Sequence, residues 1–370
     1  MIRLLYITNG ISGSGGLERV LSIKASYLAD KYNYDVHILT LNDQGKKPFY
    51  FFSPRINIHT ISVTGNFIKY IYQYVSGIRR IAGLIRPDII SVCDDGFKGF
   101  FLPFLLGKPC PMIYERHVSK LISINENNKR GFRKIFISAK FKLMNVLARS
   151  FDSFIVLTEG HMKEWPINNL TVIPNPTSFF PIDSSSLKNK TVIAVGKQSY
   201  QKGYDRLLQA WQLVNQRCPD WKLEVYGKYN LELGLNESAA TLKINDSVLF
   251  YNPVIDIQKK YLNSSIYAMS SRFEGFGMVL IEAMACGVPC ISFNCPFGPA
   301  DIIQNEKDGF LVDNGDCRAM ADKIILLMEN QSLRLRMGKA ARKNAIAYLP
   351  ENIIPRWHNL FLKLLSGKSN

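Results

Sequence analysis

Strand-like apolar runs alternate with helical patterns along almost the whole chain. In the first cycle, a strand-like run at 2–8 leads through a glycine-rich turn into a helical pattern at 17–32 and a second strand-like run at 35–40. Two strands joined by a helix lie parallel in one sheet, and the helices cover its faces. The sequence therefore predicts an α/β fold built on parallel sheets. Further strand-like runs follow at 88–93, 111–115 and 153–158.

The chain changes character near its middle. Its 370 residues suffice for two domains, at roughly 150 residues each. The segment 176–190 contains prolines and a serine run without apolar periodicity, so we expect it to be a linker. It separates residues 1–175 from residues 191–350, and each part is expected to be a doubly wound, Rossmann-like domain. Ligands of such sheets bind outside the carboxyl ends of the strands, so we expect the site in strand-to-helix loops that face a central cleft.

Positive charge is concentrated in the first half of the chain. The net charge is +16, and residues 1–175 hold 23 Lys/Arg against 12 Asp/Glu. Such a surface suits nucleic acid, a phosphorylated substrate or an acidic membrane. Residues 129–149 carry seven Lys/Arg and no Asp/Glu, with apolar residues at helical spacing. This pattern predicts a basic amphipathic helix on an anionic membrane, the alternative being a core-packed helix with a solvated face.

Some classes of protein are disfavoured by what the sequence lacks. No nucleic-acid motif appears, so nucleic acid is not an expected partner. No signal peptide and no apolar run long enough to cross a membrane is recognised. The seven cysteines form no CxxC pair, and we interpret them as reduced thiols in a reducing compartment.

Two glycine-containing loops carry groups suited to an anion. The loop at 10–16 does not fit GxGxxG, yet Gly15 and Gly16 lie at a helix start, where backbone N–H groups can approach a phosphate. Its alternative interpretation is a tight turn that requires positive φ. In the loop at 195–203, Lys197 and Lys202 lie between a strand and a helix, so their ammonium groups suit a diphosphate. The alternative is a pair of solvated lysines.

The segment SRFEGFGMVLIEAMACGVPCIS at 271–292 combines two acids with a helix start. Glu274 stands just before a helix predicted over about 278–286, and Glu282 lies one turn inside it. The free N–H groups of 275–278 attract a diphosphate, and carboxylates accept hydrogen bonds from sugar hydroxyls. Alternatively, Glu274 is a helix cap and Glu282 forms an ion pair.

Together these motifs resemble the signature of the large retaining glycosyltransferase family with the GT-B fold, often called family 4. The resemblance implies two Rossmann-like domains facing a central cleft, with a C-terminal helix, here at about 351–366, crossing back to the first domain. A helical pattern at 318–349 precedes this C-terminal helix, and prolines 350 and 355 are expected to break the pattern. The matching stretches are E-x7-E at Glu274 and Glu282, GSGGLERV at 13–20, VIPNP at 172–176, VGKQSYQKG at 195–203, CPFGPADII at 295–303 and DGFLV at 308–312.

The resemblance also implies a role for each matching residue. Lys197 and Lys202 would hold the donor's diphosphate and stabilise the leaving group. Glu274 would contact the transferred sugar, and Glu282 would bind the ribose hydroxyls. Further donor contacts are implied for Gly275, Phe276 and Gly277, and for Gly15 and Gly16 of the other domain.

One catalytic residue and the absence of a metal are implied in the same way. His117 lies where such enzymes often have a histidine near the reacting sugar, although Glu115 and Arg116 could be the matching pair. Asp94 and Asp95 are adjacent and lack DxD spacing, so no metal and no other cofactor is expected.

The sequence thus predicts a retaining, metal-independent hexosyltransferase. It would move a hexose or N-acetylhexosamine from a nucleotide-diphosphate sugar, with a UDP-sugar favoured, to a lipid-linked or polysaccharide acceptor. The expected setting is bacterial surface glycan synthesis (capsule, O-antigen or exopolysaccharide), in the cytoplasm and peripheral on the inner face of the membrane. Two alternatives stay open: a nucleotide-sugar epimerase or hydrolase of the same architecture, and a basic membrane-binding or nucleic-acid-binding protein without enzymatic activity.

Overall fold

The computed structural model describes the chain except for residues 95, 121–131 and 368–370, and except for the side chains of 132–135. The described chain forms two compact units. The N-terminal unit comprises Met1–Ser178 together with Pro350–Asn370, and the C-terminal unit comprises Phe179–Leu349.

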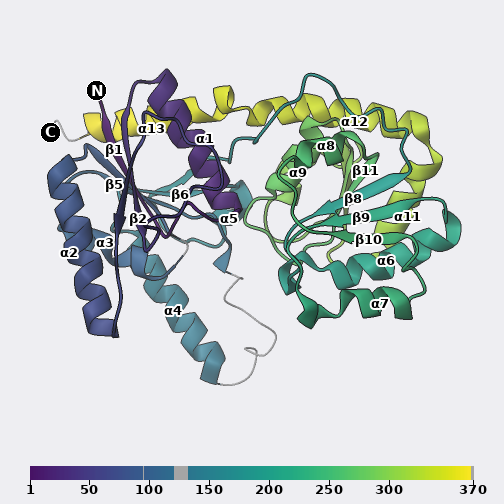
Figure 1. Cartoon of the computed structure of the whole chain (residues 1–370), viewed down its shortest axis with the longest axis horizontal. Helices are drawn as coiled ribbons and strands as arrows, with labels where there is room; N and C mark the ends of the chain where they lie inside the picture. The colour runs from purple at the N-terminus through teal and green to yellow at the C-terminus, as the bar shows by residue number, and fades with distance from the viewer. Residues whose placement is uncertain (95, 121–131, 368–370) are drawn as a thin grey trace. The chain divides into compact units, whose positions relative to one another are not determined.

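The N-terminal unit is built on a seven-stranded sheet in which all neighbouring strands run parallel (Figure 1). The strand order reverses between the neighbours β1 and β4, which is the doubly wound pattern. In sheet order, the strands are β3 (Asn57–Ile61), β2 (Asp35–Leu41), β1 (Arg3–Thr8), β4 (Ile89–Cys93), β5 (Met112–Glu115), β6 (Ser153–Val156) and β7 (Leu170–Val172).

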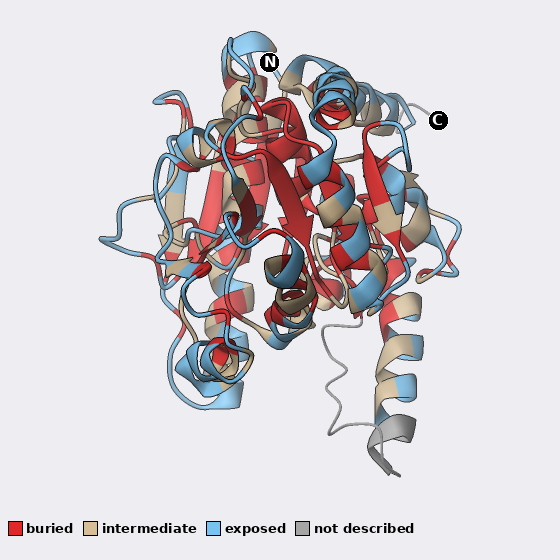
Figure 2. Ribbon diagram, turned by 90° about the vertical axis from the view of Figure 1, so that its right-hand side faces the viewer, coloured by how far each residue is buried: buried red, intermediate tan, exposed pale blue. Residues whose placement is uncertain are grey.

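Helices cover both faces of this sheet because its strands carry apolar side chains on both sides. One core contains residues of α2, α3 and α4, and the other contains residues of α1 and α13. Figure 2 shows the buried residues gathered in the strands and on the inner sides of the helices. The helices are α1 (Gly16–Lys31), α2 (Phe67–Ile85), α3 (Leu102–Leu106), α4 (Phe132–Ala148), α5 (Glu159–Met162) and α13 (Pro350–Ser366).

The C-terminal unit repeats the architecture with six parallel strands. Its order reverses between β8 and β11, so this sheet is also doubly wound. In sheet order, the strands are β10 (Val248–Tyr251), β9 (Lys222–Tyr226), β8 (Thr191–Val195), β11 (Ile266–Met269), β12 (Cys290–Phe293) and β13 (Gly309–Val312). The helices are α6 (Tyr204–Arg217), α7 (Leu235–Thr241), α8 (Ile257–Leu262), α9 (Met278–Ala285), α10 (Pro299–Ile302), α11 (Cys317–Glu329) and α12 (Gln331–Ala345).

The predicted class, two doubly wound α/β domains, is confirmed. The C-terminal helix α13 packs on α1 of the N-terminal unit through Trp357 and Phe361, which are buried. The helical pattern at 318–349 forms two helices, because Asn330 ends α11 and caps α12 with its side chain. Within the described residues, no helix combines the length and apolar character that a bilayer crossing requires.

The expected break at the two prolines is confirmed at Pro350 and wrong at Pro355. Leu349 has extended backbone after the preceding helical stretch, and Pro350 is the first residue of α13, a position where the missing N–H costs nothing. Pro355 lies inside the same helix. The buried neighbours Ile354 and Trp357 anchor this turn in the core, so tertiary packing outweighs the local penalty of proline.

Candidate active site

The reversal of strand order in the C-terminal unit marks the edge of its sheet where a ligand is expected to bind. The chain leaves β8 and β11 in opposite directions, and ligands of doubly wound sheets bind at such a point, outside the carboxyl ends of the strands. The loop after β8 carries Lys197 and Lys202, and the loop after β11 carries Glu274. Lys202 and Glu274, which are 72 positions apart in the sequence, therefore meet at one edge of the sheet.

Lys202 and Glu274 form a direct ion pair. Nζ of Lys202 lies 2.7 Å from Oε1 of Glu274, and both side chains are largely buried. The hydroxyl of Ser271 donates to the same oxygen at 2.5 Å. Oε2 of Glu274 accepts no hydrogen bond from the described residues, and two of the three ammonium donors of Lys202 are likewise uncommitted. The pair therefore keeps one acceptor and two donors for a ligand.

Backbone hydrogen bonds fasten the two loops to each other. The N–H of Arg272 donates to the carbonyl of Gln201 at 2.7 Å, and the hydroxyl of Ser270 donates to the carbonyl of Lys202 at 2.9 Å. Gly203 has φ +62, and a Cβ there would stand 2.3 Å from the carbonyl oxygen of Ser270. Glycine is required at this position both for its backbone angle and for the close approach.

A further ion pair, which the sequence did not predict, joins Arg272 of the second loop to Asp205 at the end of the first. Both Nη atoms of Arg272 donate to the carboxylate of Asp205, at 2.9 and 2.6 Å, and Nη1 also donates to the carbonyl of Tyr200 at 2.8 Å. The guanidinium lies over the Tyr200 ring, 4.1 Å from its centroid. Arg272 is adjacent to the E-x7-E element, so this signal was present in the sequence, but its partner was not visible there.

Helix α9 begins directly after this loop. Gly277 has φ +101 and precedes the first residue of the helix, and Phe276 is buried against Tyr348. Glu282 lies on the second turn, is 1% exposed, and accepts a hydrogen bond from the hydroxyl of Tyr261 at 3.3 Å. The helix thus occupies the predicted span, and Tyr261 is one hydrogen-bond partner of Glu282.

Lys197 differs from the other site residues in its surroundings. It is exposed and forms no ion pair with any residue in the described ranges. The next residue, Gln198, is buried, and its backbone N–H donates to the carbonyl of Lys228 at 2.9 Å. Lys197 therefore projects from a fixed backbone with its ammonium group available.

In the N-terminal unit, the glycine loop precedes α1 as expected, but its glycines do not have positive φ. A Cβ at Gly15 would stand 2.5 Å from Oε2 of Glu18, whereas a Cβ at Gly16 would meet no heavy atom within 4 Å. Asp43 closes the other end of the loop by accepting from the N–H of Ile11 at 2.8 Å. The interpretation as a positive-φ turn is wrong, because close packing against Glu18 accounts for the glycine instead.

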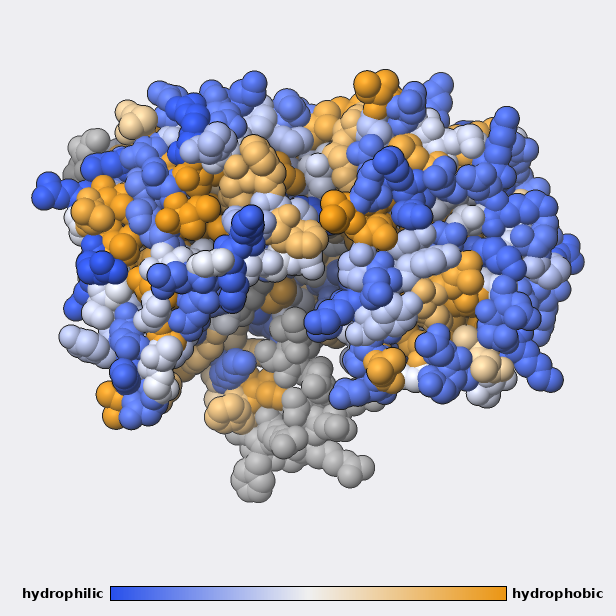
Figure 3. Space-filling model, viewed as in Figure 1, coloured by the Kyte–Doolittle hydropathy of each residue, from blue (hydrophilic) through white to orange (hydrophobic). Residues whose placement is uncertain are grey.

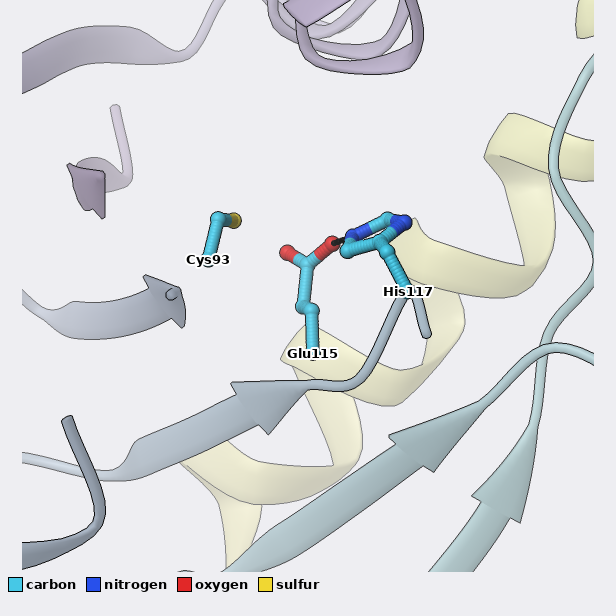
Figure 4. Close-up of side chains that lie close together, drawn as sticks. All are labelled: Cys93, Glu115 and His117. Carbon is cyan, nitrogen blue, oxygen red and sulfur yellow. Dashed lines mark hydrogen bonds and ion pairs between the residues drawn. The ribbon is translucent and has the colours of Figure 1, made fainter. Parts of the chain in front are cut away.

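His117 follows β5 and is oriented by a buried acid. Its Nε2 lies 3.2 Å from Oε2 of Glu115. Figure 4 marks this contact with a dashed line. Glu115 also accepts from the Ser91 hydroxyl and from Nζ of Lys24, whose ammonium group lies 3.8 Å from the centroid of the Trp357 ring. Burial alone would raise the pKa of Glu115, but Lys24 and His117 lower it to about 2.

The groups around Glu115 have the composition of a metal site but not its charge state. One ligand atom each from Cys93, Glu115 and His117 lies within 4.8 Å of the others (Figure 4). However, Lys24 already supplies a cation to Glu115, and burial followed by the charge of Glu115 raises the pKa of the Cys93 thiol. A divalent ion needs a thiolate and a carboxylate without a competing ammonium group. These residues therefore do not fit a metal.

Asp94 does not fit a metal site either. Its Oδ1 accepts from the side-chain amide of Asn9 at 2.8 Å and from the N–H of Gly96 at 2.7 Å. The carboxylate therefore holds the loop after β4 to the loop after β1. Its neighbour in the sequence, Asp95, lies outside the described residues.

Two doubly wound domains, one with cations and an acid at its switch point, define the GT-B class of glycosyltransferase fold. The family model for glycosyl transferases group 1 matches residues 178–344. Two relatives are 30% identical over 97% of the chain: an uncharacterized glycosyltransferase of Haemophilus influenzae, covered over its full length, and the amylovoran biosynthesis glycosyltransferase AmsD of Erwinia amylovora, covered over 99%. The chain therefore belongs to the glycosyl transferases group 1 family.

Solved structures agree with this assignment at the level of the fold. Sucrose-phosphate synthase from Thermosynechococcus elongatus superposes with a TM-score of 0.85 at 16% identity, over 99% of this chain and all of the other. HepE of Anabaena, solved in complex with UDP and glucose, gives a TM-score of 0.76 at 16% identity, over 97% of this chain and 99% of the other. The prediction of a GT-B glycosyltransferase is thereby confirmed.

Proposed function

We propose that the chain is a retaining, family 4 glycosyltransferase that moves a hexose or N-acetylhexosamine from a UDP-sugar to a lipid-linked or polysaccharide acceptor of a bacterial surface glycan. The observation that carries the proposal is the Lys202–Glu274 pair at the switch point of the C-terminal sheet. It supplies a cation for the leaving diphosphate and an acceptor for the sugar hydroxyls from one rigid pair of loops.

The charge chemistry of the reaction favours this arrangement. When the bond between the anomeric carbon and the diphosphate breaks, negative charge grows on the phosphate oxygens. Ammonium groups at Lys197 and Lys202, with the N–H groups that begin α9, stabilise this charge without reorganising. Because two lysines and a helix start suffice for this task, we propose that the reaction needs no metal and no other cofactor.

The two acids are proposed to recognise different parts of the donor. Oε2 of Glu274 accepts from a hydroxyl of the transferred sugar, while Oε1 stays with Lys202 and Ser271. Glu282, fixed by Tyr261, accepts from the ribose hydroxyls. The backbone at Gly275, Phe276 and Gly277 is proposed to contact the same donor. The roles of Gly15, Gly16 and His117 stay predictions.

The comparisons support the substrate class. The Anabaena relative was solved with UDP and glucose, and the Erwinia relative is named for amylovoran biosynthesis. From these two similarities we propose a UDP-sugar donor and a polysaccharide-related acceptor for this chain.

We further propose that α4 docks on an anionic membrane surface, which would place the enzyme peripherally on the cytoplasmic face. Phe136, Leu143 and Val146 form an exposed apolar stripe on this helix, whereas Met144 and Leu147 face the core. Figure 3 shows apolar surface on this helix and at the start of α2, where Phe67 and Ile68 are exposed. Lys142 and Arg149 flank the stripe with positive charge. Residues 129–131 of the predicted segment lie outside the described residues.

A donor-hydrolysis and transfer assay tests the activity. The full chain is incubated with UDP-sugars and GDP-mannose in EDTA, with and without a membrane extract as acceptor, and nucleotide release and products are followed. Acceptor-dependent release of UDP, with the anomeric configuration retained by NMR, is the expected result. An epimerised sugar or acceptor-independent release would identify the epimerase or hydrolase alternative. No turnover or binding with any sugar nucleotide would overturn the proposal.

Vesicle flotation tests the membrane surface. Vesicles of phosphatidylcholine with phosphatidylglycerol should carry the wild-type chain, and the double variant Phe136→Ser with Val146→Ser should float at least about tenfold less. The control is Leu231→Ser, an exposed leucine of the C-terminal unit. Equal flotation of all three proteins would remove α4 from the membrane contact.

A further inference from the structure

A second cationic site lies in the N-terminal unit, at the amino ends of the central strands of its sheet. A hollow of about 590 Å³ opens where β1, β4 and β5 begin and where α2 and α3 end. Three of its lining residues are arginines: Arg3, Arg79 and Arg86.

The charge of the lining is not balanced by the protein. Asp88 is the one acid in the lining, and its carboxylate pairs with Arg3, whose Nη2 lies 3.3 Å from Oδ1. Arg79 and Arg86 form no ion pair with any described residue. The guanidinium groups of Arg79 and Arg86, which have no carboxylate partner among the described residues, therefore line the same hollow as Arg3, which is paired with Asp88. Like charges held together repel, and an anion in the hollow would relieve this repulsion.

Two of the guanidinium groups are held in place by main-chain carbonyls. Nη1 of Arg3 donates to the carbonyl of Ile85 at 3.1 Å, at the end of α2. Nε and Nη2 of Arg79 both donate to the carbonyl of Leu105, at 3.1 and 2.5 Å. Arginine has five N–H donors, so each group keeps donors for a ligand after these bonds are made. Such fixed forks suit the oxygens of a phosphate group.

The rest of the lining is apolar. Leu106, Pro109 and Leu365 contribute carbon surface next to the arginines. A hollow of this volume lies within the range of small-molecule sites. We propose that it binds a ligand that carries one or more phosphate groups joined to an apolar portion, at a site separate from the donor site.

Calorimetric titration of the full chain with inorganic pyrophosphate tests the proposal. The wild type should bind at two sites, because the Lys197 and Lys202 loop also suits pyrophosphate. The variant Arg79→Ala with Arg86→Ala should weaken one of them at least tenfold. The control Arg80→Ala removes an exposed arginine of the same helix that does not line the hollow, and it should bind as the wild type does. Equal binding by the double variant and this control would overturn the proposal.

Further variants separate this site from the proposed function and from misfolding. Lys197→Ala with Lys202→Ala should abolish the other pyrophosphate site and leave the arginine site intact, so either site can fail alone. Arg86→Gln leaves every hydrogen bond of Arg3 and Arg79 in place, and it should still weaken binding. Unchanged pyrophosphate binding by Arg86→Gln would remove Arg86 from the site.

Flotation with lipid vesicles tests whether the phosphate belongs to a lipid headgroup or to a soluble molecule. If Arg79→Ala with Arg86→Ala lowers flotation with phosphatidylglycerol vesicles and Arg80→Ala does not, the ligand is a lipid headgroup. If flotation is unchanged while pyrophosphate binding is lost, the ligand is a soluble phosphate ester.

Discussion

Nζ of Lys202 lies 2.7 Å from Oε1 of Glu274, across two loops that belong to different strands of the C-terminal sheet. The cation proposed for the leaving diphosphate and the acid proposed for the sugar are thus already paired before a donor arrives. A donor that takes one N–H of the lysine and the open oxygen of the acid need not break this pair. The free protein is therefore organised for the charge that develops in the reaction.

Replacing Lys202 should lower turnover more than donor binding. Lys202→Ala removes a cation that acts mainly as the diphosphate leaves, so we expect kcat at saturating UDP-sugar to fall by about 10²-fold. The control Lys188→Ala removes an exposed lysine outside these loops and should keep full activity. Steady-state kinetics provides the measurement. An unchanged kcat in Lys202→Ala would remove this lysine from the mechanism.

Replacing Glu282 should act on donor affinity. Glu282→Gln keeps the size of the side chain but loses a charged acceptor for two hydroxyls, so we expect the Kd for UDP to rise by about tenfold. Tyr261→Phe removes only the hydroxyl that orients Glu282, and its effect should be smaller. Calorimetry with UDP measures both. A larger loss in Tyr261→Phe than in Glu282→Gln would contradict the assigned order.

The sheets were predictable because their strands are short apolar runs with clear ends, such as β1 and β8. The edge strand β3 was not, since Asn57, His59 and Thr60 give it little apolar character, and it is defined mainly by hydrogen bonds to β2. The boundary between α11 and α12 had a sequence signal, because Asn330 is a good helix-capping residue and a helical pattern follows it. This signal lay inside a longer helical pattern.

Candidate site residues were predictable only where a motif carried them. Lys202 and Glu274 stood in loops that a doubly wound sheet brings to one edge, so their proximity followed from topology. Lys24 stood inside a helical pattern and gave no sign that it would be buried against Glu115, 91 residues away. Pairs of this kind depend on tertiary packing, which periodicity does not encode.

Two glycines should respond differently to the same substitution. Gly203→Ala places a side chain at φ +62 and a Cβ 2.3 Å from the carbonyl oxygen of Ser270, so it should destabilise the protein by more than about 1 kcal/mol. Gly16→Ala, where a Cβ meets no heavy atom within 4 Å, should leave the melting temperature unchanged or raise it. Thermal unfolding compares them. A lower melting temperature for Gly16→Ala than for Gly203→Ala would contradict the geometry.

The glycine pair also tests the predicted role of the first glycine loop. If backbone at Gly16 meets a phosphate, Gly16→Ala should raise the KM for the donor while the melting temperature holds. An unchanged KM would leave Gly16 with a purely structural place at the start of α1.

Acid should destabilise the N-terminal unit through Glu115. Its pKa is about 2 in the folded chain and 4.5 when unperturbed, because Lys24 and His117 favour the carboxylate despite burial. The folded state therefore binds fewer protons than the unfolded state between these values. Stability from this group is complete above pH 4.5 and is lost as the pH falls toward 2, at up to about 1.4 kcal/mol per pH unit.

Denaturant unfolding at a series of pH values measures this dependence. Glu115→Gln removes the titrating group but leaves the Lys24 ammonium buried without its carboxylate, so it should cost about 3–5 kcal/mol at neutral pH. The double variant Lys24→Met with Glu115→Gln removes both charges, so it should recover much of that loss and unfold with a shallower acid dependence than the wild type. If the double variant and the wild type lose stability equally between pH 4.5 and 2, then Glu115 does not carry the acid sensitivity of this unit.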